Sequence, residues 1–349
     1  MSFPTRAYAT HASSSQLHLW ELERRALEAD DVLIDILFCG VCHSDLHQAR
    51  DEWGGSVFPM VPGHEIVGTV LSVGTGVSKW KIGDKVGVGV FVDSCRTCPQ
   101  CQAGEEQYCD EGMTATYNAQ ARDGSGPTYG GYSTQIVVQE DYIVSIPEGL
   151  PLDAAAPLLC AGITTYSPLR YFGVKPGDSV AVVGLGGLGH MGVKFAKAFG
   201  AHVTVLSHSP SKREAALALG ADDFLATGDE ATFAGHQKKF DLILDTVSAE
   251  HDLNSYLGLL KINGTMVLVG LPNPSVVSAF SLVGGRRSLA GSMIGGIKET
   301  QEMLNFCAEK GIVCEIELIA MDYINQAFHR MLNSDVRYRF VIDLATLKA

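Results

Sequence analysis

Four cysteines, Cys95, Cys98, Cys101 and Cys109, fall within fifteen residues in the spacing C-x2-C-x2-C-x7-C. Four thiolates supplied by so short a segment can surround one zinc ion tetrahedrally and leave no ligand position open. The pattern therefore predicts a structural zinc site and not a reaction centre. Disulfides, free thiols and an iron–sulfur cluster are the alternatives. Disulfides are disfavoured because we expect no secretory signal at the start of the chain.

A glycine-rich turn is the second feature with chemical meaning. The apolar run Ser179–Val183 leads directly into G-L-G-G-L-G, and a helical pattern follows. In this strand–turn–helix context the glycines permit a tight turn, close approach to a pyrophosphate and close helix packing, and the helix N-terminus favours the phosphates. A merely flexible glycine loop is the alternative. The predicted phosphate-binding residues are Gly184, Gly186, Gly187, Leu188 and Gly189.

The residues after the next predicted strand indicate which dinucleotide binds. An NAD site places an Asp or Glu there to bind the ribose 2′-hydroxyl. This chain has no carboxylate at that point but offers hydroxyls and cations, which suit a 2′-phosphate and predict NADP(H); Lys212 and Arg213 as ordinary surface residues are the alternative. The predicted contacts are Ser207, His208, Ser209 and Lys212.

A second set of metal-binding residue types is spread along the chain. Cys42 lies in a loop after one predicted strand, His64 opens another, and Cys160 lies far away in sequence. Two cysteines and one histidine make a three-ligand zinc set with a position left for water or substrate, as catalytic zinc requires. Spacing leaves the alternative open that Cys160 is a buried core cysteine and His64 a turn residue.

The elements that must position these residues change in character near residue 146. Before it, short β-branched runs broken by glycine turns predict a mostly-β domain, for which a barrel is one arrangement. These runs are Val32–Phe38, Ile66–Val73, Lys85–Val90 and Thr134–Val138. After Pro147, six candidate strands alternate with helical stretches, which predicts a doubly wound parallel sheet with right-handed crossovers. They are Ser179–Val183, Val203–Ser207, Asp223–Leu225, Phe240–Thr246, Thr265–Val269 and Ser288–Ser292.

Composition and charge exclude several classes of protein. The 349 residues, 46% of them hydrophobic, suffice for two domains. The net charge of −13 disfavours sequence-independent binding to nucleic acid or to an acidic membrane surface and favours a small-molecule partner. No transmembrane span is expected, and the cytoplasm is the expected location.

Together these motifs resemble the zinc-dependent, medium-chain alcohol dehydrogenases, and most closely the cinnamyl alcohol dehydrogenase-like, NADP-dependent aldehyde reductases. The resemblance covers essentially the whole chain. It runs through C-G-V-C-H-S-D at residues 39–45, P-G-H-E at 62–65, the four-cysteine segment, G-G-Y at 130–132, L-L-C-A-G-I-T at 158–164, the glycine turn, G-S at 291–292 and Y-R-F at 338–340.

The resemblance implies a GroES-like β-barrel catalytic domain with both zinc sites (residues 1–155), a Rossmann NADP-binding domain (156–294) and a C-terminal segment (295–349) that returns to the first domain. It implies that Cys42, His64 and Cys160 bind catalytic zinc and that Glu65 is a fourth, exchangeable ligand. Asp45 would orient His64, while Ser44 and His47 would form a proton relay. Further residues match cofactor contacts: Thr164, Val247, Val269, Ser292, Ile294 and Arg339.

The activity so implied is hydride transfer between NADP(H) and an aldehyde or primary alcohol, with two Zn²⁺ per chain, and the resemblance also implies a homodimer. Trp53 is expected to form an apolar wall for aromatic or medium-chain aldehydes. Three alternatives fit the sequence less well. A polyol dehydrogenase would favour an acidic residue after the second strand of the dinucleotide domain, as in NAD-binding proteins. A zinc-free reductase of the same fold would lack Cys42, His64 and Cys160, and a non-catalytic NADPH-binding sensor would be expected to have lost part of this ligand set. The substrate, the reaction direction and the role of residues 114–128 are left open.

Overall fold

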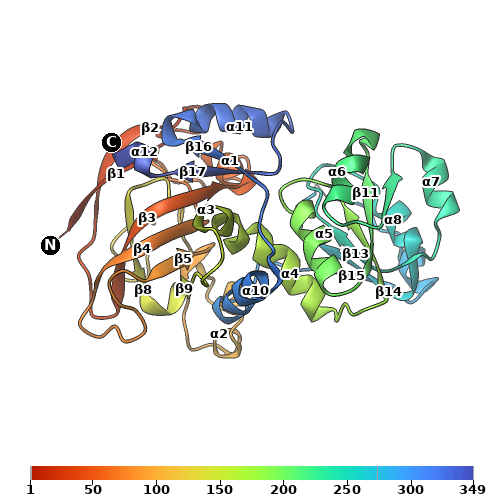
Figure 1. Ribbon diagram of the computed structural model, residues 1–349, viewed down its shortest axis with the longest axis horizontal. Coiled ribbons are helices and arrows are strands. Elements are labelled where there is room, and N and C mark those ends of the chain that lie inside the picture. Colours follow the sequence, from red (N-terminus) through yellow and green to blue (C-terminus); the bar gives the residue numbers. More distant parts are fainter. Residues whose placement is uncertain (1, 273, 349) are drawn as a thin grey trace. The chain divides into compact units, whose positions relative to one another are not determined.

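The short β-runs predicted in the first half of the chain form the central sheet of one of two units (Figure 1). The structure, a computed structural model, describes residues 2–272 and 274–348. Unit 1 comprises the chain up to Cys160 together with the segment that begins at Gly295, and unit 2 comprises Ala161–Ile294. The sequence placed these divisions after residues 155 and 294. Cys160 thus lies in the same unit as Cys42 and His64.

The main sheet of unit 1 has the order β16-β17-β3-β4-β5-β9, and β8 also pairs with β3. Its central strands are rich in β-branched residues, and Ile34, Ile36 and Ile66 are fully buried in it. β17 runs antiparallel to β3, so the C-terminal segment completes this sheet. The strands are β3 (Asp31–Val41), β4 (Ile66–Val73), β5 (Lys85–Val88), β8 (Gln135–Gln139), β9 (Val144–Ser145), β16 (Ile316–Ala320) and β17 (Arg339–Asp343).

Two small strand pairs and several helices complete unit 1. β1 (Phe3–Ala9) pairs with β2 (His18–Arg24), and β6 (Phe91–Asp93) pairs with β7 (Thr114–Ala115). The helices are α1 (His43–Ala49), α2 (Pro99–Ala103), α3 (Leu152–Ala155), α10 (Ile297–Lys310), α11 (Ile324–Leu332) and α12 (Ala345–Lys348). The 3-10 turns are η1 (Glu106–Tyr108), η2 (Glu140–Tyr142), η3 (Ala156–Leu159) and η5 (Met321–Tyr323).

Unit 2 is built on the six strands predicted from strand–helix alternation. They form one parallel sheet in the order β12-β11-β10-β13-β14-β15, and the order reverses between β10 and β13. The strands are β10 (Ser179–Val183), β11 (His202–Ser207), β12 (Asp223–Ala226), β13 (Phe240–Asp245), β14 (Leu260–Leu268) and β15 (Ser288–Gly291). The predicted doubly wound sheet is thereby confirmed.

Helices cover both faces of this sheet. Alternate strand residues point to opposite sides, and the residues on both sides are apolar and buried. Val182 and Leu244 face Gly192 of α5, whereas Ala181 and Ile243 pack in a core with α8 on the other side (Figure 1). The helices are α4 (Ala161–Tyr171), α5 (Gly189–Ala198), α6 (Arg213–Ala218), α7 (Glu230–Gly235), α8 (Leu253–Leu259) and α9 (Ala279–Val283), with the 3-10 turn η4 (Pro210–Lys212).

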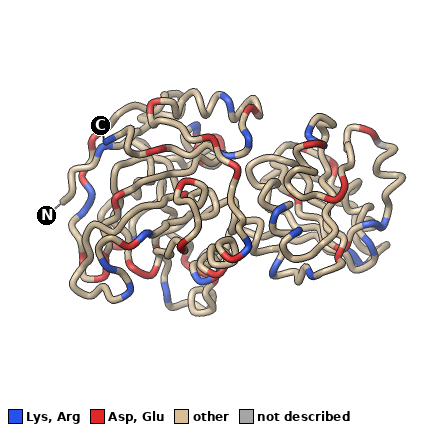
Figure 2. The backbone as a smooth tube through the Cα atoms, viewed as in Figure 1, with Lys and Arg blue, Asp and Glu red and all other residues tan. Residues whose placement is uncertain are grey.

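The surface chemistry agrees with a small-molecule partner. Lys and Arg positions are interspersed with Asp and Glu positions in both units (Figure 2). Acidic residues outnumber basic ones, 39 to 26, so an extended basic surface for nucleic acid is not favoured. Across residues 2–272 and 274–348, every helix is too short or too polar to cross a bilayer.

Candidate metal centres and dinucleotide site

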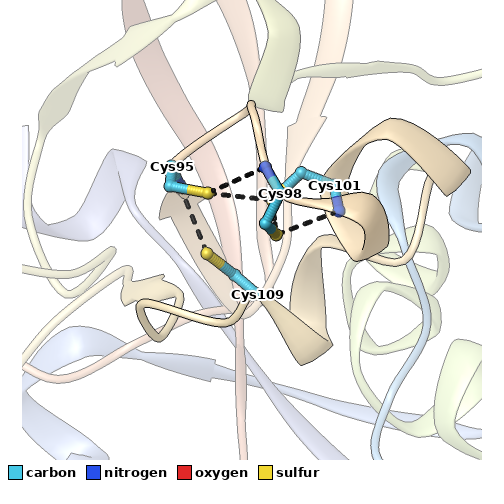
Figure 3. A group of neighbouring side chains, drawn as sticks. All are labelled: Cys95, Cys98, Cys101 and Cys109. Atoms are coloured by element: carbon cyan, nitrogen blue, oxygen red, sulfur yellow. Dashed lines mark hydrogen bonds between the residues drawn. The ribbon is translucent and has the colours of Figure 1, made fainter.

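The four-cysteine segment forms a lobe of unit 1 between β6 and β7. Cys98 is the N-cap of the short helix α2, and Pro99 at the first helical position pre-sets the backbone there. Cys101 lies within α2, Cys95 follows β6, and Cys109 follows η1. Figure 3 shows the four side chains converging from these elements. Their sulfur atoms all lie within 4.8 Å of one another.

The sulfur spacing fits a zinc ion and not disulfides. A zinc–sulfur distance of about 2.3 Å places tetrahedral sulfurs about 3.8 Å apart, whereas a disulfide needs about 2.0 Å. Cys95 Sγ lies 3.9 Å from Cys101 Sγ, and Cys98 Sγ lies 3.5 Å from Cys101 Sγ. The donor set is therefore suited to a closed tetrahedral site.

Backbone amides around this lobe stabilise thiolates. The N–H of Cys98 donates to Cys95 Sγ at 3.3 Å, and the N–H of Asp110 donates to Cys98 Sγ at 3.5 Å. Amides of Thr97 and Cys98 lower the pKa of the Cys95 thiol to about 6, while burial raises the pKa of Cys101 to about 12. Neighbouring thiols without a cation cannot all ionise, and a bound zinc ion would remove that conflict.

The second ligand group gathers residues from three distant stretches. Cys42 is the N-cap of α1 after β3, and His64 and Glu65 precede β4. Because β3 and β4 are antiparallel neighbours, with Cys39 opposite Ile66, the end of one strand lies beside the start of the other. Cys160 follows η3, and its Sγ lies 4.0 Å from that of Cys42. The candidate ligand atoms of Cys42, His64, Glu65 and Cys160 lie within 4.8 Å of one another, and all four residues are buried.

The buried carboxylate of Asp45 fixes this group through hydrogen bonds. Its carboxylate accepts N–H bonds from Cys42 at 2.9 Å and from Gly63 at 3.0 Å, and an O–H bond from Tyr132 at 3.0 Å. His64 Nδ1 lies 3.3 Å from Asp45 Oδ1, which leaves Nε2 on the side of the cysteines. Burial lowers the pKa of His64, but Asp45 raises it more, to well above its usual value. The carboxylate therefore fixes the orientation of the ring, as a metal-binding histidine requires.

Glu65 is paired with a cation inside the same group. Its Oε1 forms an ion pair with Arg339 of β17, while its buried Oε2 has no hydrogen-bond partner among the described residues. Burial raises the pKa of Glu65 to about 7, although Arg339 opposes the shift. Gly40 makes this arrangement possible, because a Cβ there would lie 1.9 Å from Glu65 Oε2. An orphaned acceptor beside two sulfurs and an imidazole fits a bound cation.

The Cys42 and Cys160 thiols affect each other's ionisation. The hydrogen bond with Cys160 lowers the pKa of Cys42 well below its usual value, and the same bond together with burial raises the pKa of Cys160. Two buried thiols at this distance cannot both ionise without a positive charge nearby. The two sulfurs and one imidazole are the donor set of a catalytic zinc site, and the residues present fit that ion.

Tyr117 is a contributor that the sequence reasoning missed. It is buried, and its ring stacks on that of His64 with centroids 5.8 Å apart and planes 17° apart. Tyr117 belongs to the segment 114–128, for which the sequence offered no role. The next residue, Asn118, accepts an N–H bond from Val57 at 2.8 Å and donates to Gln48 Oε1 at 2.6 Å. The segment thus supports His64 and fastens the loop that carries Trp53.

The predicted proton relay lies on α1 and the loop after it. Ser44 Oγ lies 3.6 Å from Cys42 Sγ. His47 lies one turn further along, and its Nδ1 is 2.5 Å from Glu52 Oε2. Trp53 is 46% exposed and stacks on the His47 ring at 5.0 Å. Glu52 was not identified from the sequence, although an acid five residues after a histidine was the available signal.

The glycine turn in unit 2 has the geometry that its pattern predicted. Gly184 has φ +87°, and a Cβ at Gly189 would lie 2.2 Å from the Gly184 carbonyl oxygen, so both positions require glycine. A Cβ at Gly186 would meet nothing within 4 Å, which leaves the backbone open to a ligand. Gly187 and Leu188 complete the turn before α5 begins.

The proposed 2′-phosphate residues lie at the carboxyl end of β11. Ser207 is the last residue of the strand, His208 is exposed, and Ser207 Oγ accepts the N–H of Ser209 at 3.3 Å. Lys212 Nζ donates to the carbonyl oxygen of Leu185 at 3.0 Å, so this cation lies against the glycine turn. Burial lowers the pKa of Lys212. No carboxylate occurs between Ser207 and Lys212.

The other predicted cofactor residues divide between the two units. Arg339 lies in unit 1, where it is buried against Glu65, and its role at the cofactor phosphates stays a prediction. The remaining ones lie in unit 2: Thr164, Val247, Val269, Ser292 and Ile294. Val247 follows β13 and Val269 follows β14, at the carboxyl ends of neighbouring parallel strands, where dinucleotides bind in such sheets.

Comparisons with known proteins identify the family to which the chain belongs. Residues 28–148 match the model of the alcohol dehydrogenase GroES-like domain, and residues 187–309 match that of the zinc-binding dehydrogenases. An NADP-dependent alcohol dehydrogenase C of Mycolicibacterium smegmatis is 59% identical over 98% of this chain and 99% of its own. The aldehyde reductase YahK of Escherichia coli is 55% identical over 98% and 99%. A cinnamyl alcohol dehydrogenase of Sorghum bicolor superposes with a TM-score of 0.96 at 49% identity, over 98% of each chain.

Proposed function

Because the chain belongs to the zinc-binding, medium-chain alcohol dehydrogenases, we propose that it transfers hydride between NADP(H) and an aldehyde or primary alcohol. The observation that carries the proposal is the convergence of Cys42, His64 and Cys160 in one buried group with Glu65. Aromatic and medium-chain aldehydes are the proposed substrates, since Trp53 offers an exposed apolar wall beside the proton relay.

Two groups are proposed to hold two zinc ions. Cys95, Cys98, Cys101 and Cys109 would hold a structural ion, and Cys42, His64 and Cys160 a catalytic one. The catalytic ion, when bound, supplies a Lewis acid that polarises the carbonyl. The protein orients His64 through Asp45 and keeps Glu65 paired with Arg339, so that this carboxylate can exchange with water or substrate.

Proton delivery falls to α1 and its following loop. As the carbonyl oxygen gains negative charge, the Ser44 hydroxyl would give it a proton, and His47 would replenish that proton from solvent. Glu52 holds the Nδ1 side of His47, which fixes the ring for this task. Trp53 covers one face of the same ring and limits its rotation.

The proposed cofactor is NADP(H), which supplies or accepts the hydride. Its pyrophosphate would lie on the turn of Gly184, Gly186 and Gly189, and its 2′-phosphate beside Ser207 and Lys212. The M. smegmatis relative is named as NADP-dependent, in agreement with the missing carboxylate after β11. Reduction of aldehydes is the proposed direction.

The test is oxidation of NADPH with benzaldehyde, with and without a zinc chelator. We expect turnover that the chelator abolishes. Turnover unaffected by metal removal, or NADPH binding without turnover of any aldehyde, would contradict the proposal, and the latter would favour a non-catalytic NADPH sensor. In addition, Ser207→Asp should weaken the binding of NADPH far more than that of NADH. Ser125→Asp, in an exposed loop of unit 1, should change the affinity for neither dinucleotide.

We further propose a homodimer formed through unit 2. β15 is an edge strand of the parallel sheet, and Val276, Phe280 and Val283 nearby are 75–90% exposed. Exposed strand edges and large apolar side chains favour association with a second copy. Sedimentation analysis should give twice the chain mass. The two clusters of reduced cysteines support a reducing compartment, and the cytoplasm is the proposed location.

A further inference from the structure

A histidine outside the metal groups makes two hydrogen bonds in unit 2. His251 Nε2 lies 2.8 Å from Oδ2 of the buried Asp245, and its Nδ1 lies 2.8 Å from the carbonyl oxygen of Ala249. A carbonyl and a carboxylate are both acceptors, so both ring nitrogens must carry a proton for the two bonds to exist together. The geometry therefore specifies an imidazolium.

Asp245 connects this ring to two neighbouring segments. Its other carboxylate oxygen accepts the N–H of Val247 at 3.1 Å. Its main-chain oxygen accepts the N–H groups of Val269 and Gly270, at 2.9 and 3.1 Å. His251 thus stabilises the residue that ties the end of β13 to the segment after β14.

The turn held by Asp245 packs directly on the glycine turn. Thr246 Oγ1 donates to the carbonyl oxygen of Val183 at 2.7 Å, and a Cβ at Gly184 would lie 2.8 Å from Val247 Cγ2. The strand order reverses between β10 and β13, and ligands of doubly wound sheets bind outside the carboxyl ends at that point. A shift of the Thr246–Val247 turn would therefore change the wall of the dinucleotide site.

We propose that His251, as an imidazolium, is a positioning residue for bound NADPH. It holds the Asp245 carboxylate so that the Thr246–Val247 turn keeps its shape against the glycine turn. His251 is not one of the residues assigned above to the dinucleotide or to the metal ligands. This inference rests on the proposed dinucleotide site and adds a residue that acts behind it.

The surroundings of His251 give the role a pH dependence. The hydrogen bond to Asp245 raises the pKa of His251 although burial lowers it, and Asp252 adds a further favourable charge. Tyr256 of α8 contacts the ring edge-on, with centroids 5.4 Å apart. A raised pKa means that both bonds are complete below the ordinary value of 6.5 and that one is lost as the pH rises through the raised value. NADPH affinity should fall in that upper range.

The experiment compares His251→Phe, His251→Gln and His202→Gln. Phenylalanine keeps the ring against Tyr256 but has no donor, whereas glutamine keeps one donor. His202 is the control, because it lies 3.9 Å from Asp222 at the opposite end of the sheet. Binding of NADPH is measured by fluorescence and binding of adenosine 2′,5′-bisphosphate by calorimetry, from about pH 6 to about pH 9.5, around the ordinary histidine pKa.

We expect His251→Phe to weaken NADPH binding at least about tenfold near pH 6 and to leave bisphosphate binding within about twofold, because the bisphosphate lacks the second bridging phosphate and the nicotinamide riboside. His251→Gln should lie between wild type and His251→Phe, and both variants should lose the fall in affinity at high pH. His202→Gln should match wild type. If His251→Phe does not fold, the His251→Gln pH series decides.

If His251→Phe weakened the binding of NADPH and of the bisphosphate equally, His251 would have a general structural role and the inference would be overturned. Wild-type NADPH affinity in His251→Phe, or a wild-type pH profile in His251→Gln, would overturn it as well. These outcomes leave the proposed function intact. Failure of the wild-type protein to bind either ligand would overturn the dinucleotide site itself.

Discussion

The two candidate metal groups use similar donors but are built in opposite ways. One takes four cysteines from a single lobe of fifteen residues, and the lobe's own amides stabilise the sulfurs. The other joins residues up to 118 positions apart, brought together by the pairing of β3 with β4 and by the turn η3, and it relies on Asp45, Tyr132 and Arg339 around it. A local lobe supports a closed site for stability, whereas a site assembled by the whole fold can keep an open position for chemistry.

The largest difference should appear when one ligand of the dispersed group is removed. Cys160→Ala should lower kcat/KM for aldehyde reduction about 10³-fold, because loss of the Lewis acid costs several kcal/mol of transition-state stabilisation. Steady-state kinetics with NADPH and benzaldehyde measure it. Cys307→Ala, at a buried cysteine outside both groups, is the control. Retention of more than about a tenth of the activity would remove Cys160 from the ligand set.

Removal of one ligand from the local lobe should act on stability instead. Cys98→Ser should lower the unfolding midpoint by about 10 °C, since metal binding at such sites contributes directly to folding. The activity per folded molecule should stay within about threefold of wild type. Calorimetry and single-turnover kinetics measure the two effects. Full activity loss at unchanged stability would reverse the roles assigned to the two groups.

Asp45→Asn tests how far the dispersed group depends on its supporting residues. An amide cannot accept all the donors that converge on this carboxylate, so His64 should lose its fixed orientation, with a 10- to 100-fold loss in zinc affinity or turnover. Competition with a chelator measures the affinity. The control is Asp35→Asn, at a half-exposed carboxylate of β3 paired with Lys348. Equal effects at the two positions would show that Asp45 has no special role.

A smaller effect is expected at Asn118, which fastens the Trp53 loop. Asn118 has φ +57°, so Asn118→Gly preserves the backbone and removes only the bonds to Val57 and Gln48. Loss of these bonds, worth about 1 kcal/mol each, should change the preference for aromatic over small aliphatic aldehydes several-fold. Asn263→Gly is the control, at another left-handed asparagine, in unit 2. Uniform loss with all aldehydes would contradict a role in specificity.

The sequence predicted local features better than assembled ones. The strand Ser179–Val183, the glycine turn and the four-cysteine lobe each lie within one short segment, where residue type and spacing carry the physical requirement. The resemblance of the chain to a known family supplied the dispersed ligand set. Spacing alone could not bring Cys160 to Cys42, because that meeting depends on how the turn η3, whose C-cap is Cys160, packs against β3.

The residues that the sequence did not identify act through other residues. Tyr117 carries no spacing signal, and for Glu52 the only signal was its position five residues after His47, because each residue matters only through the ring it contacts in three dimensions. The same holds for His251, whose partner Asp245 becomes important only where two parallel strands end side by side. Arg339 was assigned to the cofactor phosphates by resemblance, and its ion pair with Glu65 was not foreseen.

Zinc content per chain, measured by elemental analysis of the purified protein and its variants, tests the central claim most directly. The account predicts two zinc ions in the wild type and one in both Cys160→Ala and Cys98→Ser, with activity lost only in the first. A single zinc ion in the wild type, or two retained after Cys160→Ala, would contradict it.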